Sequence, residues 1–419
     1  MVIAEAPPRR APVALPHPKR NWPPFDCVAL VLQGGGALGS YQAGVYEALA
    51  ERGLHPDWVA GISIGAINAA IIAGNAPDER VARLKGFWET ITANHLLDWA
   101  ATHQQFAPQG EVARGLFNRM SATLTALFGA PGFFEPRYPA PWWQPDGTMQ
   151  ATSFYSAERL KNTLERFVDF DRINAGETRF SAGAVNVQTG NFVYFDNEHR
   201  EIRAEHVMAS GSLPPGFPAT EIDGEFYWDG GLVSNTPLQW VVDAEVRKDT
   251  LAFQVDLWPA EGPLPRNLAE VMTRQKEIQY SSRTRAGTDQ FARVQRVRGA
   301  LADLLAKLPK ELRNAEETEV LREVAGHNVY NIVQLIYRSK KYERHSKDYE
   351  FSRLTMQDHW RAGYQDASTS LQHREVLERP AHREGVFTFD FLREEQRPSR
   401  ASIPNIVRKG QRPPSRKSR

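Results

Sequence analysis

The sequence predicts an α/β fold with a mainly parallel central sheet. A short apolar run over 27–32 is followed by a glycine-rich turn and by residues 40–52, whose apolar side chains recur at helical spacing. A second apolar run over 58–62 leads into a small-residue helix over 65–73. This order of strand, helix, strand and helix forms a βαβ unit. Nearly continuous apolar runs are typical of strands buried on both faces of a parallel sheet.

Beyond the βαβ unit, the same criteria predict further helices and strands. The helices cover 78–92, 156–168 and 205–210, and the strands cover 180–187, 191–195, 225–228 and 251–257. Residues 100–150 are rich in Gly, Pro and aromatic side chains, and we interpret them as an irregular excursion from the sheet. The strand over 251–257 is the last one that the sequence predicts for the core.

The C-terminal third is strongly charged and has a helical pattern. The predicted helices cover 268–305, 311–324 and 355–371. The chain therefore divides into four predicted parts, which are a disordered N-terminal arm over 1–25, an α/β domain over 26–258, a helical extension over 259–375 and an irregular basic tail over 376–419.

Composition excludes some classes of function. A hydrophobic fraction of 41% and a charged fraction of 24% are those of a globular protein with a sizeable core. A net charge of +1 argues against nucleic acid as the main partner. The tail from Arg397 to Arg419 holds eight Lys or Arg residues and no acid, so the rest of the chain is mildly acidic.

Several features predict a cytoplasmic location. No apolar run approaches the roughly eighteen residues of a membrane span, so we expect no transmembrane segment. The Pro- and Arg-rich N-terminus lacks the apolar core of a signal peptide. The single cysteine, Cys27, lies in an apolar run, as expected of a buried thiol in a reducing compartment. The basic cluster at 338–341 and the basic tail could contact the anionic inner face of a membrane. Solvated helix faces and a disordered end explain these basic residues at least as well.

The turn Gly61-Ile62-Ser63-Ile64-Gly65 carries the first candidate catalytic residue. The G-x-S-x-G pattern places a serine hydroxyl on a tight turn between a strand and a helix, known as a nucleophile elbow, where Gly61 and Gly65 relieve crowding. The positive end of the helix dipole points at the same place. Because a strand-like run and a helix-like run flank this turn, we favour a nucleophile over a plain turn for Ser63.

The preceding turn over 34–39 (GGGALG) permits three interpretations. It can be a tight turn without a ligand. It can also bind a dinucleotide, because Gly34, Gly36 and Gly39 fit G-x-G-x-x-G and Asp57 follows about twenty residues later. Asp57, however, precedes the second strand, whereas a ribose-binding acid belongs at the end of that strand.

The third interpretation is an oxyanion hole. Its donors would be the backbone N–H groups of Gly35, Gly36 and Ala37, together with that of Ile64 after the candidate nucleophile. Two glycine turns at the ends of adjacent strands favour this interpretation.

A serine nucleophile needs a base. Asp229 with His327 or His359 would reproduce the chain order of an α/β-hydrolase triad, but no motif marks either histidine. Asp229 alone is better placed, because it ends an apolar run and precedes Gly230 and Gly231, which allow another backbone to approach closely. A desolvated carboxylate beside a serine can act as the base directly. The alternative is an ordinary Asp-Gly turn.

In chain order, G-G-G-x-x-G at 34–39, G-x-S-x-G at 61–65 and D-G-G at 229–231 resemble the motifs of the patatin-like phospholipases. Three further segments resemble the same family, at 184–190 (AVNVQTG), 209–218 (ASGSLPPGFP) and 221–238 (EIDGEFYWDGGLVSNTPL). The resemblance covers about residues 26–258, and 348–363 is similar to bacterial members with an added C-terminal region. It implies a patatin-like three-layer α/β fold with a helical C-terminal extension.

The resemblance also implies a function. In this family a Ser–Asp dyad hydrolyses acyl esters of lipids through an acyl-enzyme, so Ser63 would be the nucleophile, Asp229 the base and Gly34 to Gly39 the oxyanion turn. The partner is then a lipid ester, and no metal or cofactor is implied. The family often has Lys or Arg at the fifth position of the glycine motif, where this chain has Leu38. That departure leaves a neutral ester open as the substrate.

Two other functions remain open at this point. One is a dinucleotide-binding oxidoreductase, which the glycine spacing alone would allow. The other is a non-catalytic protein that binds a lipid surface through its basic tail.

Overall fold

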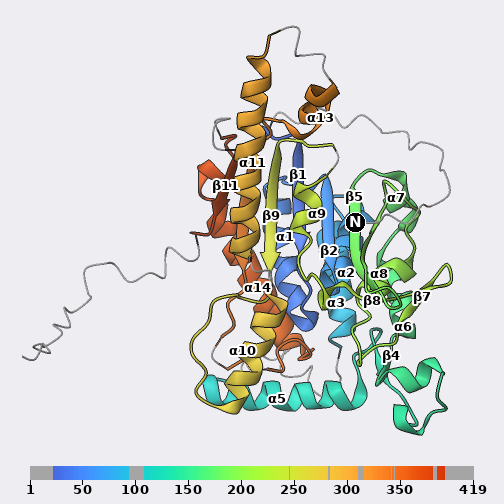
Figure 1. Cartoon of the computed structure of the whole chain (residues 1–419). Coiled ribbons are helices and arrows are strands. Elements are labelled where there is room, and N and C mark those ends of the chain that lie inside the picture. The colour runs from blue at the N-terminus through green and yellow to red at the C-terminus, as the bar shows by residue number, and fades with distance from the viewer. Residues whose placement is uncertain are drawn as a thin grey trace, which may run out of the picture.

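The computed structural model describes residues 22–93, 108–244, 246–281, 284–309, 316–340, 342–343, 345–380 and 385–391 (Figure 1). The predicted N-terminal arm therefore lies outside the described residues as far as residue 21, and so does the basic tail from residue 392.

Among the described residues, nine strands form one central sheet. Their order across the sheet is β11-β10-β9-β1-β2-β5-β8-β7, and β6 also pairs with β5. The strands of this sheet are β1 (Cys27–Leu32), β2 (Trp58–Ile62), β5 (Arg179–Asn186), β6 (Phe192–Asp196), β7 (Thr220–Ile222), β8 (Glu225–Asp229), β9 (Thr250–Asp256), β10 (Tyr330–Ile336) and β11 (Val386–Phe389).

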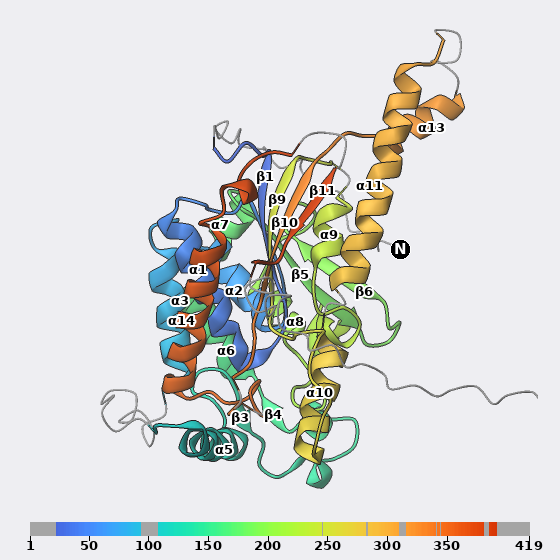
Figure 2. The same ribbon diagram turned by 90° about the vertical axis from the view of Figure 1, so that its left-hand side faces the viewer.

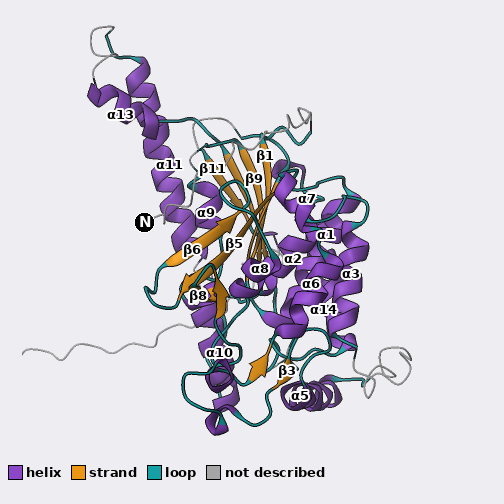
Figure 3. Ribbon diagram, turned by 90° about the vertical axis from the view of Figure 1, so that its right-hand side faces the viewer, coloured by secondary structure: helices purple, strands orange, loops and turns teal. Residues whose placement is uncertain are grey.

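The sheet is mainly parallel, as the sequence predicts. All neighbours from β11 to β5 pair in parallel, whereas β6, β7 and β8 form antiparallel pairs at one side of the sheet (Figure 3). The strands β3 (Glu135–Pro136) and β4 (Tyr155–Ser156) form a separate antiparallel pair.

Helices cover both faces of the sheet (Figure 2). The helices α1, α2, α3, α6 and α14 lie on one face, and α9 and α11 lie on the other. The described helices are α1 (Ser40–Glu51), α2 (Ile64–Ala73), α3 (Arg80–Ile91), α5 (Glu111–Phe128), α6 (Glu158–Phe167), α7 (Phe170–Ala175), α8 (Ala204–Ser210), α9 (Leu238–Val242), α10 (Leu268–Tyr280), α11 (Thr284–Ala306), α13 (Glu316–Val324) and α14 (Arg353–Ser370). The three-layer α/β architecture expected from the sequence is confirmed.

The strand β1 shows why its sequence is apolar throughout. Leu30 and Leu32 pack into the large core cluster with α1, α2, α3 and α14, whereas Ala29 and Val31 pack into the cluster on the opposite face with α9 and Phe291 of α11. Both faces of the strand are therefore buried, so a polar residue on either face would be destabilising. Cys27 belongs to the second cluster and is buried, as predicted.

Three predictions about the elements are wrong. The predicted helix over 268–305 is two helices, because α10 ends at Tyr280 and α11 begins at Thr284. Residues 100–150 are not irregular throughout, because 18 of them form α5. The strand over 251–257 (β9) is not the last of the core, because β10 and then β11 continue the sheet beyond it. The residues of β10 are nearly all buried, as in β1, but Asn331 and Gln334 interrupt its apolar sequence, so the apolar pattern that marked β1 was missing.

The C-terminal extension packs against the first helix of the α/β domain. At the crossing of α1 and α14, a Cβ on Gly44 would lie 1.9 Å from the carbonyl oxygen of Trp360, and one on Gly363 would lie 1.9 Å from that of Tyr41. The Tyr41 hydroxyl also donates to Asp366 at 2.7 Å. The domain boundary at 258/259 stays a prediction, although the central sheet continues across it.

No helix among the described residues is both long and apolar enough to cross a bilayer.

The helix crossing predicts the effect of an added methyl group. Gly363→Ala should lower the free energy of unfolding by roughly 2–3 kcal/mol, because the methyl group meets backbone atoms of α1 that cannot move aside. The measurement is urea unfolding followed by circular dichroism. The matched control is Gly287→Ala on α11, where the added Cβ meets no atom within 4 Å and where Ala should stabilise the helix by up to about 1 kcal/mol. Equal stability of both variants would contradict this packing.

Candidate active site

The two glycine turns lie side by side at one edge of the sheet. Because β1 and β2 are parallel neighbours, both turns follow the carboxyl ends of their strands, where open α/β sheets bind ligands. A Cβ on Gly65 would lie 2.3 Å from the carbonyl oxygen of Leu32, and one on Gly34 would lie 3.0 Å from the Cβ of Ser63. The two turns therefore approach so closely that glycine is required in each.

Ser63 has a strained backbone. Its φ of 55° and ψ of −125° lie in a region that residues with a Cβ rarely adopt, and α2 begins directly after it. Gly61 is needed beside it, because a Cβ there would lie 2.2 Å from the carbonyl oxygen of Gly65. The Ser63 N–H donates to the Ser210 hydroxyl at 3.0 Å, and that hydroxyl donates to the Gly183 carbonyl at 2.6 Å. The serine thus lies on a braced nucleophile elbow.

Asp229 ends β8 and is only 2% exposed. The strand β8 runs antiparallel to β5, with Asp229 opposite Ala184, and the Asp229 N–H donates to the Ser212 carbonyl at 3.0 Å. A Cβ on Gly230 would lie 2.6 Å from the Gly183 carbonyl oxygen, which explains the first glycine of the D-G-G motif. The sheet therefore fixes the backbone of Asp229 and buries its carboxyl group.

Burial raises the pKa of Asp229 to about 7, and the side chain of Ser63 and the backbone N–H of Gly231 lower it by less. The Gly231 N–H lies 2.7 Å from Oδ1 of Asp229. The structure thus brings Ser63 and Asp229 together, although 165 residues separate them in the chain. A carboxyl group with this pKa exchanges protons near neutral pH.

The predicted oxyanion donors need one correction. Among the described residues, no acceptor is bonded to the N–H groups of Gly35, Gly36 or Ile64. The prediction for Ala37 is wrong, because its N–H donates to the backbone carbonyl of Asp348 at 2.8 Å. That carbonyl comes from a part of the chain more than 300 residues away, which sequence reasoning did not connect with the turn.

Three further side chains hold the turn from outside the predicted motifs. Nδ2 of Asn235 and Nε1 of Trp258 donate to the Gly34 carbonyl at 3.1 and 2.9 Å. Oε1 of Gln33 accepts the N–H groups of Leu257 and Trp258 at 2.6 and 2.9 Å. Sequence reasoning missed these as site residues, although Asn235 lies in the segment 221–238 that resembles the family. Trp258 had no comparable signal.

The C-terminal extension also reaches the first glycine turn. A Cβ on Gly36, whose φ is 56°, would lie 2.1 Å from the Asp348 carbonyl oxygen. Nζ of Lys276 lies 2.8 Å from the Asp348 carboxylate, and Nζ of Lys347 lies 2.9 Å from Glu277. Two ion pairs between α10 and the segment before α14 therefore secure the carbonyl that rests on the turn.

The structure argues against a dinucleotide site at the glycine turn, because Asp57, the acid that would bind the ribose, lies too far from that turn. Asp57 precedes β2 and accepts the N–H of Val28 at 2.8 Å, so it lies at the amino edge of the strands, opposite the glycine turn. Leu38, at the position where the family often has Lys or Arg, is fully buried in the core.

The two histidines considered for a triad are engaged elsewhere. Nε2 of His359 on α14 lies 3.1 Å from Oε1 of Glu343 in a buried pair, and Nε2 of His327 lies 3.4 Å from Asp303. Neither contact includes Ser63.

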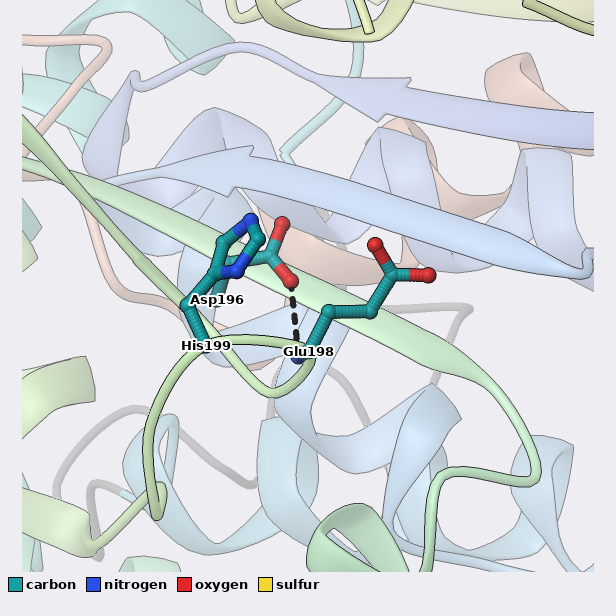
Figure 4. A group of neighbouring side chains, drawn as sticks. All are labelled: Asp196, Glu198 and His199. Atoms are coloured by element: carbon teal, nitrogen blue, oxygen red, sulfur yellow. Dashed lines mark hydrogen bonds between the residues drawn. The ribbon is translucent and has the colours of Figure 1, made fainter. Parts of the chain in front are cut away.

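Within the described residues, one group of side chains has the spacing of a metal site, and sequence reasoning did not note it. Figure 4 shows Asp196, Glu198 and His199, with the Glu198 N–H donating to Asp196 at 2.9 Å. Arg179 pairs with both carboxylates, at 3.0 Å to Asp196 and 2.5 Å to Glu198, and Ser181 donates to Asp196 at 2.6 Å. The arginine already supplies the positive charge, so this cluster is an ion pair at the amino end of β5.

Two family models match the chain. Residues 30–241 match the model described as patatin-like phospholipase, and residues 278–383 match one described as patatin phospholipase. The first range contains both glycine turns and Asp229. The second contains Asp348.

Curated relatives carry related names. The chain is 26% identical over 215 residues to patatin-like phospholipase domain-containing protein 7 of Rattus norvegicus and 50% identical over 212 residues to its namesake from Mus musculus. Each match covers 51% of this chain and 12% of the relative. The lysophospholipase nte1 of Aspergillus terreus is 53% identical over 49 residues, which are 12% of this chain and 3% of that protein. The chain thus spans only a small part of these relatives.

Among solved structures, VipD from Legionella pneumophila covers 84% of this chain and 67% of its own, with 15% identity and a TM-score of 0.36.

The raised pKa of Asp229 predicts how its substitution affects stability. The folded state binds this proton more tightly than the unfolded state, whose pKa is near 3.8, so the resulting stabilisation is lost as pH rises through about 7. Asparagine does not ionise. From pH 5 to pH 8, the free energy of unfolding of wild type should therefore fall by about 2–3 kcal/mol relative to that of Asp229→Asn. The measurement is urea unfolding of both proteins at both pH values. A difference independent of pH would contradict the burial of an ionisable carboxyl group.

Proposed function

Since the chain belongs to the patatin-like phospholipase family, we propose that it is a lipid acyl hydrolase in which Ser63 is the nucleophile and Asp229 the base. The single observation that carries the assignment is the pairing of a strained, partly exposed serine with a buried carboxyl group whose pKa is about 7. An ordinary Asp-Gly turn has no reason to bury a titratable group beside a serine hydroxyl.

Acylation would proceed as follows. Oγ of Ser63 attacks the carbonyl carbon of the lipid ester while its proton passes to the Asp229 carboxylate. The carbonyl oxygen becomes an oxyanion, which the N–H groups of Gly35, Gly36 and Ile64 stabilise from two adjacent turns. The C–O bond to the alcohol then breaks, and the leaving alkoxide takes the proton from Asp229.

Deacylation would use the same groups. Asp229 takes a proton from water, the hydroxide attacks the acyl carbon of the Ser63 ester, and the same N–H groups stabilise the second oxyanion. Collapse of this intermediate releases the fatty acid and returns the proton to Oγ of Ser63. This sequence needs no group other than those of the chain and water.

The proposed substrate is a carboxylic ester of a phospholipid or a related lipid. Leu38 leaves the oxyanion turn without the cation common in the family, which removes one candidate contact for a phosphate group. A neutral ester is therefore as well supported as a phospholipid. Hydrolysis in the cytoplasm, with the basic tail in contact with an anionic membrane surface, remains part of this proposal.

A fluorophosphonate probe tests the nucleophile. The probe should label wild type, because an activated serine attacks its phosphorus, and Ser63→Ala should lose labelling completely. The measurement is in-gel fluorescence after reaction with a fluorescent probe. Ser368→Ala on α14 is the matched control and should label like wild type. Labelling of Ser63→Ala at the wild-type level would refute the assignment.

The pH dependence tests the base. Because only the Asp229 carboxylate accepts the serine proton, kcat/KM for a soluble short-chain ester should rise about tenfold per pH unit well below pH 7 and level off above it. Asp229→Asn should lose turnover by at least about a thousandfold while staying folded. The measurement is initial rates from pH 5 to pH 9. Turnover retained by Asp229→Asn would instead point to another base.

A further inference from the structure

We propose that the outer face of α5, together with the exposed aromatic residues of the segment between β3 and β4, docks on the neutral surface of a lipid aggregate. This inference rests on the proposed lipid substrate, and it concerns a surface distinct from the basic tail.

The outward side of α5 is apolar. Val112, Leu116, Met120, Leu127 and Phe128 are 87%, 65%, 50%, 60% and 71% exposed. Their spacing places most of them along one side of the helix. Large apolar side chains on the outside of a helix are normal when isolated, but a contiguous row of them marks an interaction site.

The inward side of α5 is mixed: Phe117 and Ala122 are buried there, but four polar side chains are buried beside them, whereas an ordinary surface helix buries mainly its apolar face. Arg114, Asn118, Ser121 and Thr125 are buried beneath the helix. The Arg114 guanidinium pairs with Asp358 of α14 at 2.5 Å. These contacts hold the helix in this orientation, so its apolar row faces away from the protein.

Aromatic side chains extend the row beyond the C-terminal end of α5. Tyr138, Trp142 and Trp143 are 95%, 70% and 78% exposed. The Tyr155 hydroxyl of β4 donates to the Ala126 carbonyl at 2.9 Å, which ties this segment to the helix. Tryptophan and tyrosine favour the boundary between water and lipid, because one part of each ring system is apolar and another binds water.

The position of this surface fits the proposed site. In Figures 1 and 2, α5 lies beyond the carboxyl ends of the parallel strands, the edge at which the glycine turns and Ser63 also lie. A lipid ester entering from an aggregate would therefore meet the catalytic edge and the apolar row on the same end of the molecule.

The charges on this surface favour a neutral lipid surface over an anionic one. The exposed side of α5 carries one acid, Glu111, and one base, Arg119. It thus has no net charge with which to attract an anionic membrane. Binding would depend on apolar burial and should be insensitive to salt.

The test is flotation of the full-length Ser63→Ala chain with phosphatidylcholine vesicles, so that hydrolysis plays no part. Ser63→Ala should bind at low salt and at about 0.5 M NaCl alike. Adding Leu116→Gln and Met120→Gln should weaken binding about tenfold or more, and adding Trp142→Gln and Trp143→Gln should do the same. Thermal unfolding by circular dichroism checks that each variant is folded.

The matched control is Val320→Gln with Leu321→Gln on α13, at the opposite end of the molecule, where the same side-chain classes are 59% and 43% exposed. It should bind like its parent. Absent binding to phosphatidylcholine, binding only to anionic vesicles, or equal binding by the α5 variants would overturn the proposal. The proposal would also be overturned if the parent chain is a dimer in size-exclusion chromatography without lipid and Leu116→Gln with Met120→Gln makes it a monomer. A second copy of the chain, and not lipid, would then cover the face. Vesicle binding by a wild type that hydrolyses no ester would contradict the proposed function and leave the docking face supported.

Discussion

The site depends on the close backbone approach of two turns that follow neighbouring parallel strands. Strands in a sheet lie about 4.8 Å apart, so the turns after β1 and β2 start at that separation and draw closer only where side chains are missing. Gly65 packs against the backbone of Leu32 and Gly34 packs against Ser63, and neither glycine has a side chain that would keep the turns apart. The proposed nucleophile and the proposed oxyanion donors come from different turns. Their spacing is therefore set by the sheet itself, which no loop movement can easily alter.

The C-terminal extension determines which donors remain available. The Asp348 carbonyl takes the N–H of Ala37 and lies against Gly36, so this segment helps to fix the left-handed φ of Gly36. The ion pair of Asp348 with Lys276 secures the segment, and the packing of α14 on α1 secures the helix that follows it. The proposed oxyanion turn is therefore held on one side by its own strand and on the other by residues far along the chain. The extension and the α/β domain share one functional structure.

The sequence predicted elements whose cause is local. β1 and β2 match their predicted bounds because both faces of each are buried, and the elbow at Ser63 was recognisable because Gly61 and Gly65 have no substitute there. Prediction from the sequence failed where contacts between distant segments decide the structure. The loss of Ala37 as a donor depends on Asp348, and α5 shows an apolar row with no core to receive it. The sequence did not predict this helix, and no pattern within it shows that its apolar side faces outward.

Unfavourable features of the molecule gather at the carboxyl edge of the strands. Ser63 has a strained backbone, Asp229 buries an ionisable group that no cation of the described residues faces, and α5 exposes an apolar row to water. At the amino edge the comparable buried acid, Asp196, is matched by Arg179 and Ser181. The same chain thus pairs the buried carboxylate of Asp196 with an arginine, whereas Asp229 has hydrogen-bond partners in Ser63 and Gly231 but no cationic partner among the described residues. Selection for stability alone would have treated both edges alike, so the difference between them indicates where function has constrained the sequence.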